Sequence, residues 1–424
     1  MTQLIKNSQY TVTITGYTAE GAGVARINGC VVFIPDVLLG EECVIQIVKV
    51  GAQVAFGKLV QLIQPSPQRV APLCPAFPQC GGCDFWHMSY EEELVLKTQR
   101  VSDALTRIGG FSLPLSPIVG APETARYRNK AQFPVGVQGG RVISGFFRQR
   151  SHAIVPTDDC LLQTTLANRV AVSVRAWMES CGVPAYDELT HKGVIRHVFV
   201  RTGRESAVLC LVAARAPKAI PAFVETITRD FPEITGIVLN LNPIRTNVIL
   251  GETERTLWGD PFVTDTLCGL TFRLAPKAFY QVNHAQAERL YQIAVDFAAL
   301  DETQTALDLY CGAGTITLCL ARHARHVTGI EVVPDAIENA KENAARNGIE
   351  NVTFLCADAS NMPELTPDVI VVDPPRKGLD ANVVKKIAAM RPAHVVYVSC
   401  DPATMARDAK LLCADGYTLT RAVP

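Results

Sequence analysis

The stretch Thr305–Thr317 constrains the fold of this chain more than any other. Its sequence, TALDLYCGAGTIT, begins with an apolar run, turns at residues 312–314 and continues into an apolar segment of helical length. Glycines in such a turn allow the backbone to approach a ligand closely. A second apolar strand, 326–332, contains Glu331, and a carboxylate there can accept hydrogen bonds from ribose hydroxyls. The stretch therefore predicts the first βα unit of a nucleoside-binding domain.

Thr317 indicates which nucleoside cofactor this turn accepts. A dinucleotide fingerprint would place a third glycine at this position, for close helix–strand packing and for a pyrophosphate at the helix N-terminus. Only Gly312 and Gly314 are present, and a single G-x-G after D-x-x-x is typical of methyltransferases that use S-adenosylmethionine (SAM), which has no phosphate. We therefore expect SAM, with a plain tight turn as the alternative.

From residue 305 onward, short apolar strands alternate with helices. We expect strands at 305–311, 326–332, 351–357, 367–373, 394–400 and 417–423, and helices at 334–347, 381–390 and 403–414. This alternation predicts a doubly wound parallel α/β sheet that binds ligands beyond the carboxyl ends of its strands. We assign residues 261–424 to this domain, with a helix that begins after an N-cap at Asn283.

Two further regions precede the α/β domain. Residues 1–62 contain short alternating strands separated by glycine turns, which predicts a small β-barrel. Residues 72–260 mix helices and strands, which predicts an α+β central domain. His197 lies in one of these strands, and we interpret it as a structural histidine rather than a catalyst.

Composition limits the setting in which the chain works. Hydrophobic residues make up 48% of the 424 positions, enough for a full core, and no apolar run is long enough to cross a bilayer. The first ten residues lack the hydrophobic region of a signal peptide, so we expect a cytoplasmic protein, a monomer without an obligate protein partner. Fourteen cysteines in a reducing compartment predict buried thiols and bound metal rather than disulfides.

Three cysteines gather in a loop rich in glycine and proline. Cys74, Cys80 and Cys83 are separated by five and then two residues, and Cys160 is the best candidate for a fourth ligand. Four thiolates suit zinc or an iron–sulfur cluster, so the spacing alone does not choose the metal. Buried free cysteines are less consistent with a loop that has so little core.

The segment 126–150 departs from the chain's net charge of −1. It holds six basic residues and no acidic one, interleaved with Tyr127, Phe133, Phe146 and Phe147. Guanidinium groups suit phosphates and aromatic faces suit unstacked bases, so the segment fits single-stranded RNA. A solvated basic β-hairpin explains the pattern equally well. RNA binding by a nearly neutral chain would depend on this local patch and on shape.

Two strand ends carry the candidate chemistry. Asp373 ends the fourth strand, and two prolines after it form a rigid turn that fixes its carboxylate over the cofactor pocket. Amino-group methyltransferases have an aromatic residue after this motif, whereas Arg376 follows here. Cys400 ends the fifth strand, just before an expected helix start at Asp401 and Pro402. A helix N-terminus lowers the pKa of a thiol from about 8.5.

A reactive thiol beside a SAM pocket suggests one reaction in particular. Carbon 5 of a pyrimidine is too poor a nucleophile to attack a sulfonium methyl group directly. Addition of the Cys400 thiolate at C6 makes C5 enolate-like, so that it accepts the methyl group. A base then removes H5 and the thiolate leaves. We interpret Cys311, the thiol in the cofactor turn, as structural.

Together these motifs resemble a known family. PKAFYQVN, DLYCGAGT, GIEV, VVDPPRKG and SCDPATMARD are similar to the motifs of SAM-dependent RNA uracil-5-methyltransferases. GAGVARINGCVVFIPDVLLGE, near the N-terminus, resembles a TRAM domain, an OB-like RNA-binding barrel. The barrel and the cysteines resemble the branch that modifies 23S rRNA, whose cysteines hold a [4Fe–4S] cluster. The tRNA branch, as a family, lacks both features.

The resemblance implies a role for individual residues. The expected contacts to SAM are Gln281, Tyr310, Gly312, Glu331, Asp358 (near the adenine) and Asp373. The expected cluster ligands are Cys74, Cys80, Cys83 and Cys160, with zinc as the less favoured occupant. Gln281 and Asp373 would also border the target uracil, and Cys400 would be the nucleophile. Residues 126–150 would help to bind 23S rRNA while the uridine flips out of its stack.

The sequence departs from the family in one respect. The family continues past the point corresponding to Pro424 with a last sheet strand and a glutamate that is a candidate general base, and no residue here matches that glutamate. We therefore expect a truncated chain with impaired sheet closure and slow product release. Two other functions stay open, which are uracil-5 methylation of tRNA and RNA binding or chaperoning without catalysis.

Overall fold

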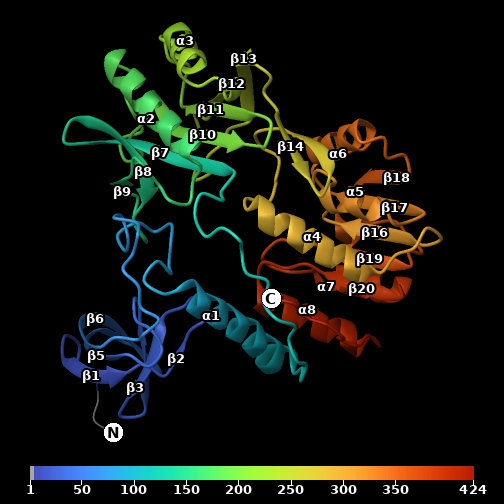
Figure 1. Cartoon of the computed structure of the whole chain (residues 1–424), viewed down its shortest axis with the longest axis horizontal. Coiled ribbons are helices and arrows are strands. Elements are labelled where there is room, and N and C mark those ends of the chain that lie inside the picture. The colour runs from blue at the N-terminus through green and yellow to red at the C-terminus, as the bar shows by residue number, and fades with distance from the viewer. Residues whose placement is uncertain (1–3) are drawn as a thin grey trace.

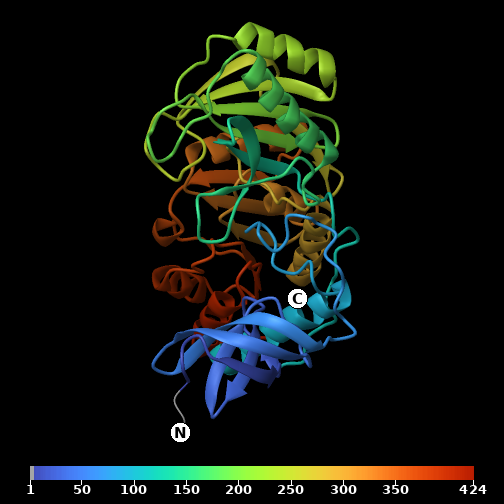
Figure 2. The same cartoon turned by 90° about the vertical axis from the view of Figure 1, so that its left-hand side faces the viewer.

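The computed structural model describes residues 4–424 and shows three parts (Figure 1). A small barrel lies at one end and a central sheet with two helices at the other, as Figure 2 shows from a second side. A parallel sheet with helices on both faces forms the third part, on the right of Figure 1. The α/β fold class with an N-terminal OB-like barrel and an α+β centre is confirmed.

The barrel consists of six strands. These are β1 (Gln9–Thr13), β2 (Gly16–Tyr17), β3 (Gly23–Ile27), β4 (Cys30–Ile34), β5 (Glu42–Val50) and β6 (Val54–Gln64), in the order β1-β5-β6-β4-β3-β2. Alternate residues point inward, so Val32 and Ile34 are fully buried while Phe33 between them is partly exposed. Buried Glu41 accepts two hydrogen bonds from Arg69, at 2.6 and 2.8 Å, and thereby fixes the connector that leaves the barrel.

A helix leads from the barrel toward the rest of the chain. α1 (Tyr90–Asp103) begins after Ser89, whose hydroxyl accepts a hydrogen bond from the backbone N–H of Glu92, and three glutamates follow in its first turn. It continues as the π-helical turn η1 (Ala104–Gly109), which packs against the last helix of the chain.

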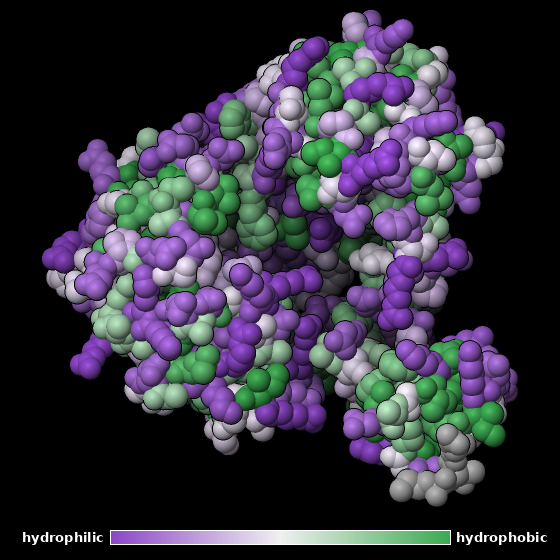
Figure 3. All heavy atoms as spheres, turned by 180° about the vertical axis from the view of Figure 1, so that it is seen from behind, coloured by the Kyte–Doolittle hydropathy of each residue, from purple (hydrophilic) through white to green (hydrophobic). Residues whose placement is uncertain are grey.

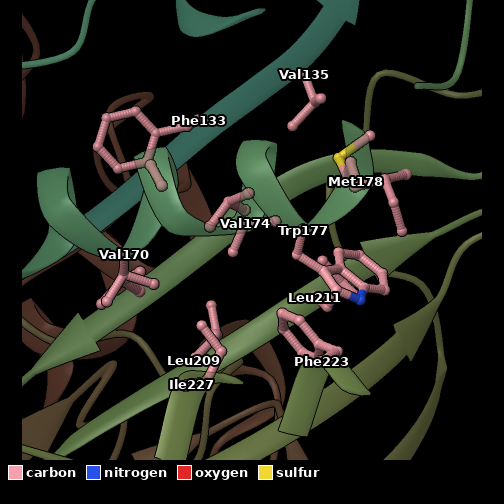
Figure 4. Packing of buried hydrophobic residues seen from close by; sticks show 14 of the residues in the cluster. Phe133, Val135, Val170, Val174, Trp177, Met178, Leu209, Leu211, Phe223 and Ile227 are labelled. Atoms are coloured by element: carbon pink, nitrogen blue, oxygen red, sulfur yellow. The ribbon is translucent and has the colours of Figure 1, made fainter. Parts of the chain in front are cut away.

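The central part is built on one mixed sheet. Its strands are β7 (Lys130–Gln138), β8 (Arg141–Phe147), β9 (Ile154–Pro156), β10 (Ile195–Thr202), β11 (Ala207–Ala213), β12 (Ile234–Leu241) and β13 (Thr253–Gly259), in the order β13-β12-β11-β10-β7-β8-β9. α2 (Thr165–Ser180) and α3 (Ile220–Asp230) pack together on one face of this sheet. Figure 4 shows that core, in which Trp177 and Phe223 lie 4.7 Å apart between ring centroids.

The parallel sheet and its helices form the C-terminal part. Its elements are β16 (Thr305–Leu309), α5 (Thr315–Ala321), β17 (His326–Glu331), α6 (Pro334–Arg346), β18 (Val352–Cys356), the 3-10 turn η2 (Ala359–Asn361), β19 (Val369–Val372), α7 (Ala381–Met390), β20 (His394–Tyr397) and α8 (Pro402–Ala414). The strand order is β18-β17-β16-β19-β20, all parallel. The order reverses between β16 and β19, and ligands bind at such a switch point.

Alternate side chains of the sheet enter two different cores. Val369 and Val371 of β19 face one core, together with α4 (His284–Ala298), α5 and the hairpin β14 (Val263–Leu267)–β15 (Leu270–Leu274). Ile370 and Val372 face the other core, together with α7. The predicted N-cap of α4 is confirmed, since Asn283 accepts a hydrogen bond from the N–H of Gln286 at 3.2 Å.

The predicted sixth strand, 417–423, is wrong. No residue from 415 to the end is in a strand, and backbone carbonyls of Ala422 and Pro424 accept hydrogen bonds from Ser116 and Val119 instead. A strand needs a neighbour that completes its ladder. The nearest edge is that of β20, and a cavity of about 1770 Å³ lies between β20 and this segment.

No helix within residues 4–424 is both long enough and apolar enough to cross a bilayer.

Candidate functional site

The turn after β16 lies at the switch point of the parallel sheet. Gly312 and Gly314 both have positive φ, at 54° and 81°, and Tyr310 has a φ of 68°. A tyrosine rarely adopts this conformation, and such strain concentrates at functional sites. The backbone N–H groups of Tyr310 and Cys311 both donate to the carbonyl of Ile330, at 2.9 and 3.1 Å. The turn is therefore fixed against β17.

Glu331 lies directly beside this turn. Its Oε2 accepts a hydrogen bond from the N–H of Gly312 at 3.2 Å, and its Oε1 accepts from Val332 and Val333 at 2.9 and 3.0 Å. The carboxylate is thus held at the end of β17 against the glycine turn. The structure brings together two residues that were expected to contact SAM.

The surroundings of Gly314 and Thr317 explain why these two residue types occur at these positions. A Cβ on Gly314 would lie 3.1 Å from Ala340 of α6 and 3.1 Å from the ring of Phe354, in β18. Thr317 is fully buried, and its hydroxyl donates to Asp308 Oδ2 at 2.6 Å. A dinucleotide fingerprint has its third glycine at position 317. Here that position is occupied by Thr317, whose hydroxyl is hydrogen-bonded to Asp308 in β16.

Asp358 lies at the same edge of the sheet as Tyr310, since the two residues follow the carboxyl ends of the parallel strands β18 and β16. Burial, and after it the charges of Asp358 and Asp380, raise the pKa of the Tyr310 hydroxyl to about 12. Asp358 itself is exposed after β18, where its Oδ1 accepts hydrogen bonds from the hydroxyl and N–H of Ser360 at 2.6 and 2.7 Å. These bonds lower the pKa of Asp358, so it is ionised.

Asp373 and Cys400 follow neighbouring strands. Val372 pairs with Tyr397, so β19 and β20 end side by side, with Asp373 after one and Cys400 after the other. Burial raises the pKa of the Asp373 carboxyl to about 6. The Cys400 thiol is exposed, in contrast to Cys311, which is buried and whose thiol pKa is raised by burial.

The loops that carry these two residues are tied together. Asp401 caps α8, as its side chain accepts from the N–H groups of Ala403 and Thr404 at 2.9 and 3.3 Å, so the predicted helix start is confirmed. The hydroxyl of Thr404 donates to the carbonyl of Arg376 at 3.2 Å. The first turn of α8 therefore fixes the loop after Asp373.

Gln281 lies outside the sheet, in the loop between β15 and α4. It is partly buried, and the side-chain amide of Asn129 donates to its backbone carbonyl at 2.9 Å. Among residues 4–424 no hydrogen bond joins Gln281 to Tyr310, Glu331 or Asp373. Its contact with SAM, like that of the other residues expected to bind this cofactor, stays a prediction.

The surface is hollowed between the C-terminal part and the other two parts (Figure 3). Cys400 and Ser399 line the large cavity described above, which also extends along β20, α4 and α8. The thiol therefore opens onto space that a large ligand can enter.

The four cysteines singled out from the sequence line one cavity. Cys74, Cys80, Cys83 and Cys160 border a space of about 300 Å³ between the loop after the barrel and the edge of the central sheet. Arg128 is in its lining, as is Lys130, whereas no carboxylate contributes to it. The cavity is therefore suited to an anionic group, such as thiolates around metal.

One backbone N–H donates to a sulfur atom of this set. The N–H of Gly82 donates to Cys80 Sγ at 3.4 Å, whereas the N–H of Gln163 donates to the backbone carbonyl of Cys160. Hydrogen bonds to sulfur are characteristic of iron–sulfur sites, where they set the reduction potential. Burial raises the pKa of the thiols of Cys80, Cys83 and Cys160. Neutral thiols are consequently favoured until a cation binds.

No three His, Cys, Asp or Glu side chains within residues 4–424 are grouped closely enough to hold one metal ion. The four thiols border a common cavity, and four thiolates suit either zinc or an iron–sulfur cluster. A metal cluster held by these cysteines stays a prediction.

His197 borders the same cavity. It is 7% exposed, and burial next to Arg196 lowers its pKa to about 4, so the imidazole is neutral. A neutral imidazole in a strand interior is what the sequence interpretation expected.

The basic segment 126–150 forms the predicted hairpin, β7–β8, but part of it is not available to RNA. Phe133 is fully buried in the central core, so it cannot stack on a base. Arg126 is paired with Asp159 at 2.6 Å. Arg148 and Arg150 are exposed. The aromatic part of the RNA-binding expectation was wrong for Phe133 because alternate residues of β7 face the core.

Sequence reasoning missed Trp86 and Asn129. Trp86 stands three residues after Cys83 and lines the same cavity as the four cysteines, so its place in the cysteine loop is the signal that could have identified it. Asn129 lies more than 150 residues from the loop that it contacts. No local pattern could have identified it.

Comparison with known proteins matches these features. Residues 4–60 match the TRAM domain family and residues 300–416 match a methyltransferase domain family. Proteins named uncharacterized RNA methyltransferase are 43% identical over 422 residues in Halalkalibacterium halodurans and 42% identical over 430 residues in Oceanobacillus iheyensis. These alignments cover 97% and 99% of this chain, and 92% and 93% of the relatives.

A solved structure is similar over almost the whole chain. It is the tRNA (uracil-54, C5)-methyltransferase of Pyrococcus abyssi in complex with S-adenosyl-L-homocysteine. The TM-score is 0.78 with 25% identity, over 95% of this chain and 93% of the other. The uncovered 5% of the chain is smaller than the barrel, so this tRNA enzyme shares the three-part architecture. The expectation that tRNA enzymes lack the barrel is therefore wrong for this enzyme.

Proposed function

Since this chain belongs to the family of SAM-dependent RNA methyltransferases, we propose that it transfers the methyl group of SAM to carbon 5 of a uracil in RNA. The observation that carries the proposal is the exposed thiol of Cys400 at the end of β20, beside Asp373 at the end of β19. An amine or hydroxyl acceptor would have no use for a thiol at this position.

The proposed reaction has three steps. The Cys400 thiolate forms a bond to C6 of the uracil, and the electron pair moves to C5 and the adjacent carbonyl. C5 then takes the methyl group from the sulfonium of SAM, which leaves as S-adenosylhomocysteine. A base removes H5, and the C6–S bond breaks to restore the ring and the thiolate.

The geometry of the glycine turn supports binding of SAM beside Gly312 and Glu331. Glu331 is held beside the N–H of Gly312, where a carboxylate can accept from ribose hydroxyls. Tyr310 and Asp358 lie on the same side of the sheet, toward which the adenosine would extend. Asp373 and Gln281 would then border the uracil, and Asp373 has a pKa raised to about 6 by burial.

The cysteine cavity would hold a [4Fe–4S] cluster. Cys74, Cys80, Cys83 and Cys160 supply four thiols, and Arg128 and Lys130 supply positive charge for the anionic cluster. The N–H of Gly82, which donates to Cys80 Sγ, supports the same occupant. A bound cluster would crosslink segments that are otherwise far apart in the chain.

For the RNA we propose 23S rRNA, with tRNA as the alternative. The motifs of the sequence support rRNA, whereas the structural similarity to a tRNA enzyme favours tRNA. The barrel does not decide between them, because the structural match to a tRNA enzyme covers 95% of this chain. Methylation of 23S rRNA and of unmodified tRNA by the same preparation, with SAM labelled in its methyl group, distinguishes the two.

The covalent step can be tested without the final proton removal. RNA that contains 5-fluorouridine should form an adduct with the protein that survives denaturing electrophoresis, and only when SAM is present. Cys400→Ala should form none. Cys356→Ala is the matched control, since Cys356 is also an exposed thiol at the end of a strand, β18, and it should form the adduct normally. An adduct on Cys400→Ala, or none on the wild-type protein with either RNA, would overturn the proposed mechanism.

A further inference from the structure

The five residues 126–130 lie between the cysteine cavity and the Gln281 loop. On one side, the N–H of Arg126 donates to the carbonyl of Leu161 at 2.6 Å and the N–H of Arg128 donates to Leu162 at 3.0 Å. The guanidinium of Arg126 also donates to the carbonyl of Cys160, at 3.0 Å. This segment, called the strap below, is thus bonded along the loop that carries the fourth cysteine.

On its other side, the strap holds the Gln281 loop. The N–H of Asn129 donates to the carbonyl of Val282 at 2.9 Å, and its side-chain amide donates to the carbonyl of Gln281, also at 2.9 Å. The backbone of Arg128 forms an isolated β-bridge with that of Asn283, the residue that caps α4. The strap consequently fixes the backbone of three successive residues of this loop.

The ends of the same loop are anchored independently of the strap. Before Gln281, buried Arg201 donates to the carbonyls of Pro276 and Ala278 at 3.2 and 2.6 Å, and the hydroxyl of Tyr280 donates to Asp265 at 2.8 Å. After Gln281, Nδ1 of His284 lies 3.0 Å from the same oxygen of Asp265. Gln281 lies between these anchors, and within residues 4–424 Asn129 makes the one hydrogen bond that reaches it. Loss of Asn129 would free Gln281 without releasing the loop as a whole.

We propose that the strap transmits the state of the cysteine cavity to Gln281, with Asn129 as a positioning residue for the methyl transfer. This inference rests on the proposed function, in which Gln281 borders the uracil. The position of Cys160 sets the position of residues 161–162, these fix the strap, and Asn129 in turn fixes Gln281. The glycine turn and Glu331 are not part of this chain of contacts, so the strap reaches SAM only through Gln281.

The first test separates positioning from general stability. Asn129→Ala should lower kcat at least tenfold and should change the KM for SAM by a smaller factor, because the glycine turn and Glu331 stay in place. Asn242→Ala is the matched control, because Asn242 is also buried in the central part and its amide donates to two loop carbonyls, those of Val248 and Ile249. It should leave kcat within twofold. If Asn129→Ala does not fold, Asn129→Asp keeps the shape, removes the donor and should show the same loss.

An unchanged kcat for both variants at position 129, or an equal loss in Asn242→Ala, would overturn the assignment of Asn129.

The second test does not depend on methyltransferase activity. Backbone hydrogen exchange of the protein as purified without oxygen is compared with that of protein stripped of metal by a chelator. Exchange in 126–130 and 279–283 should accelerate severalfold, and exchange in 305–331 should not change.

Unchanged exchange in the strap and the Gln281 loop after metal removal would overturn the transmission. Failure of the wild-type protein to methylate any RNA would instead contradict the proposed function, while the exchange result would still decide whether the cavity and the loop are coupled.

Discussion

The hydroxyl of Thr317 lies 2.6 Å from Oδ2 of Asp308, and both side chains are fully buried beneath the glycine turn. The other oxygen of Asp308 has no hydrogen-bond partner among the described residues. Burial raises the pKa of this carboxyl to about 7, while the bond from Thr317 opposes the shift. The floor of the cofactor turn therefore contains a group that titrates near neutral pH.

Ionisation of Asp308 should make the free energy of unfolding depend on pH. The pKa of Asp308 is higher in the folded chain than in the unfolded one, so its contribution is present at low pH and is lost as pH rises toward about 7. Asp308→Asn keeps the hydrogen bond from Thr317 and does not ionise. Its unfolding free energy relative to the wild type should rise by roughly 4 kcal/mol between pH 4 and pH 7. Denaturant titrations across this range measure the difference, and parallel curves for the two proteins would contradict it.

Glu331 should determine affinity for SAM. Glu331→Ala removes the acceptor for the ribose hydroxyls and the carboxylate that holds Gly312, so the Kd for SAM should rise by about 10–100-fold, or about 1.4–2.8 kcal/mol. Isothermal titration calorimetry measures this change directly. Glu338→Ala, an exposed glutamate on α6, is the control and should bind SAM normally. Equal affinities for all three proteins would place SAM elsewhere.

The cysteine cavity predicts the metal content. Protein purified without oxygen should be brown and should contain about four iron and four sulfide per chain. Cys80→Ser should lose most of this iron. Cys181→Ser should retain it, because Cys181 is exposed and does not line the cavity. Colourless protein with one zinc per chain would show that the cavity holds a different metal.

The exposed arginines after β8 should contribute to RNA affinity by charge. Arg148→Ala and Arg150→Ala should each weaken binding of all RNAs similarly and reduce the slope of log K against log salt by about 1. Arg229→Ala is the control, since Arg229 is exposed on α3 and is already paired with Asp230. Unchanged salt slopes would remove this patch from the RNA-binding surface. Fluorescence anisotropy at several salt concentrations provides the data.

Local sequence patterns predicted most of the parallel sheet. The helix starts at Asn283 and Asp401 could be identified because an N-cap is a short-range contact between neighbouring residues. Expected strands were one to three residues longer than observed at some ends, as at Cys400, which follows β20 rather than belonging to it. The sixth strand failed for a different reason. Its pattern was that of a strand, but a strand also needs a partner, and the described sheet supplies none.

The sequence by itself determined the chemistry that this chain can carry, because the thiols, the acidic strand ends and the glycine turn are each visible as short patterns. The tertiary structure decided which of these groups act together. Phe133 lies in the core rather than on the surface because its strand, β7, pairs with β10 and packs against α2. Asn129, just before β7, lies against Gln281 although 152 positions separate them in the sequence. Such contacts join residues that are distant in the sequence, and only the folded chain places them side by side.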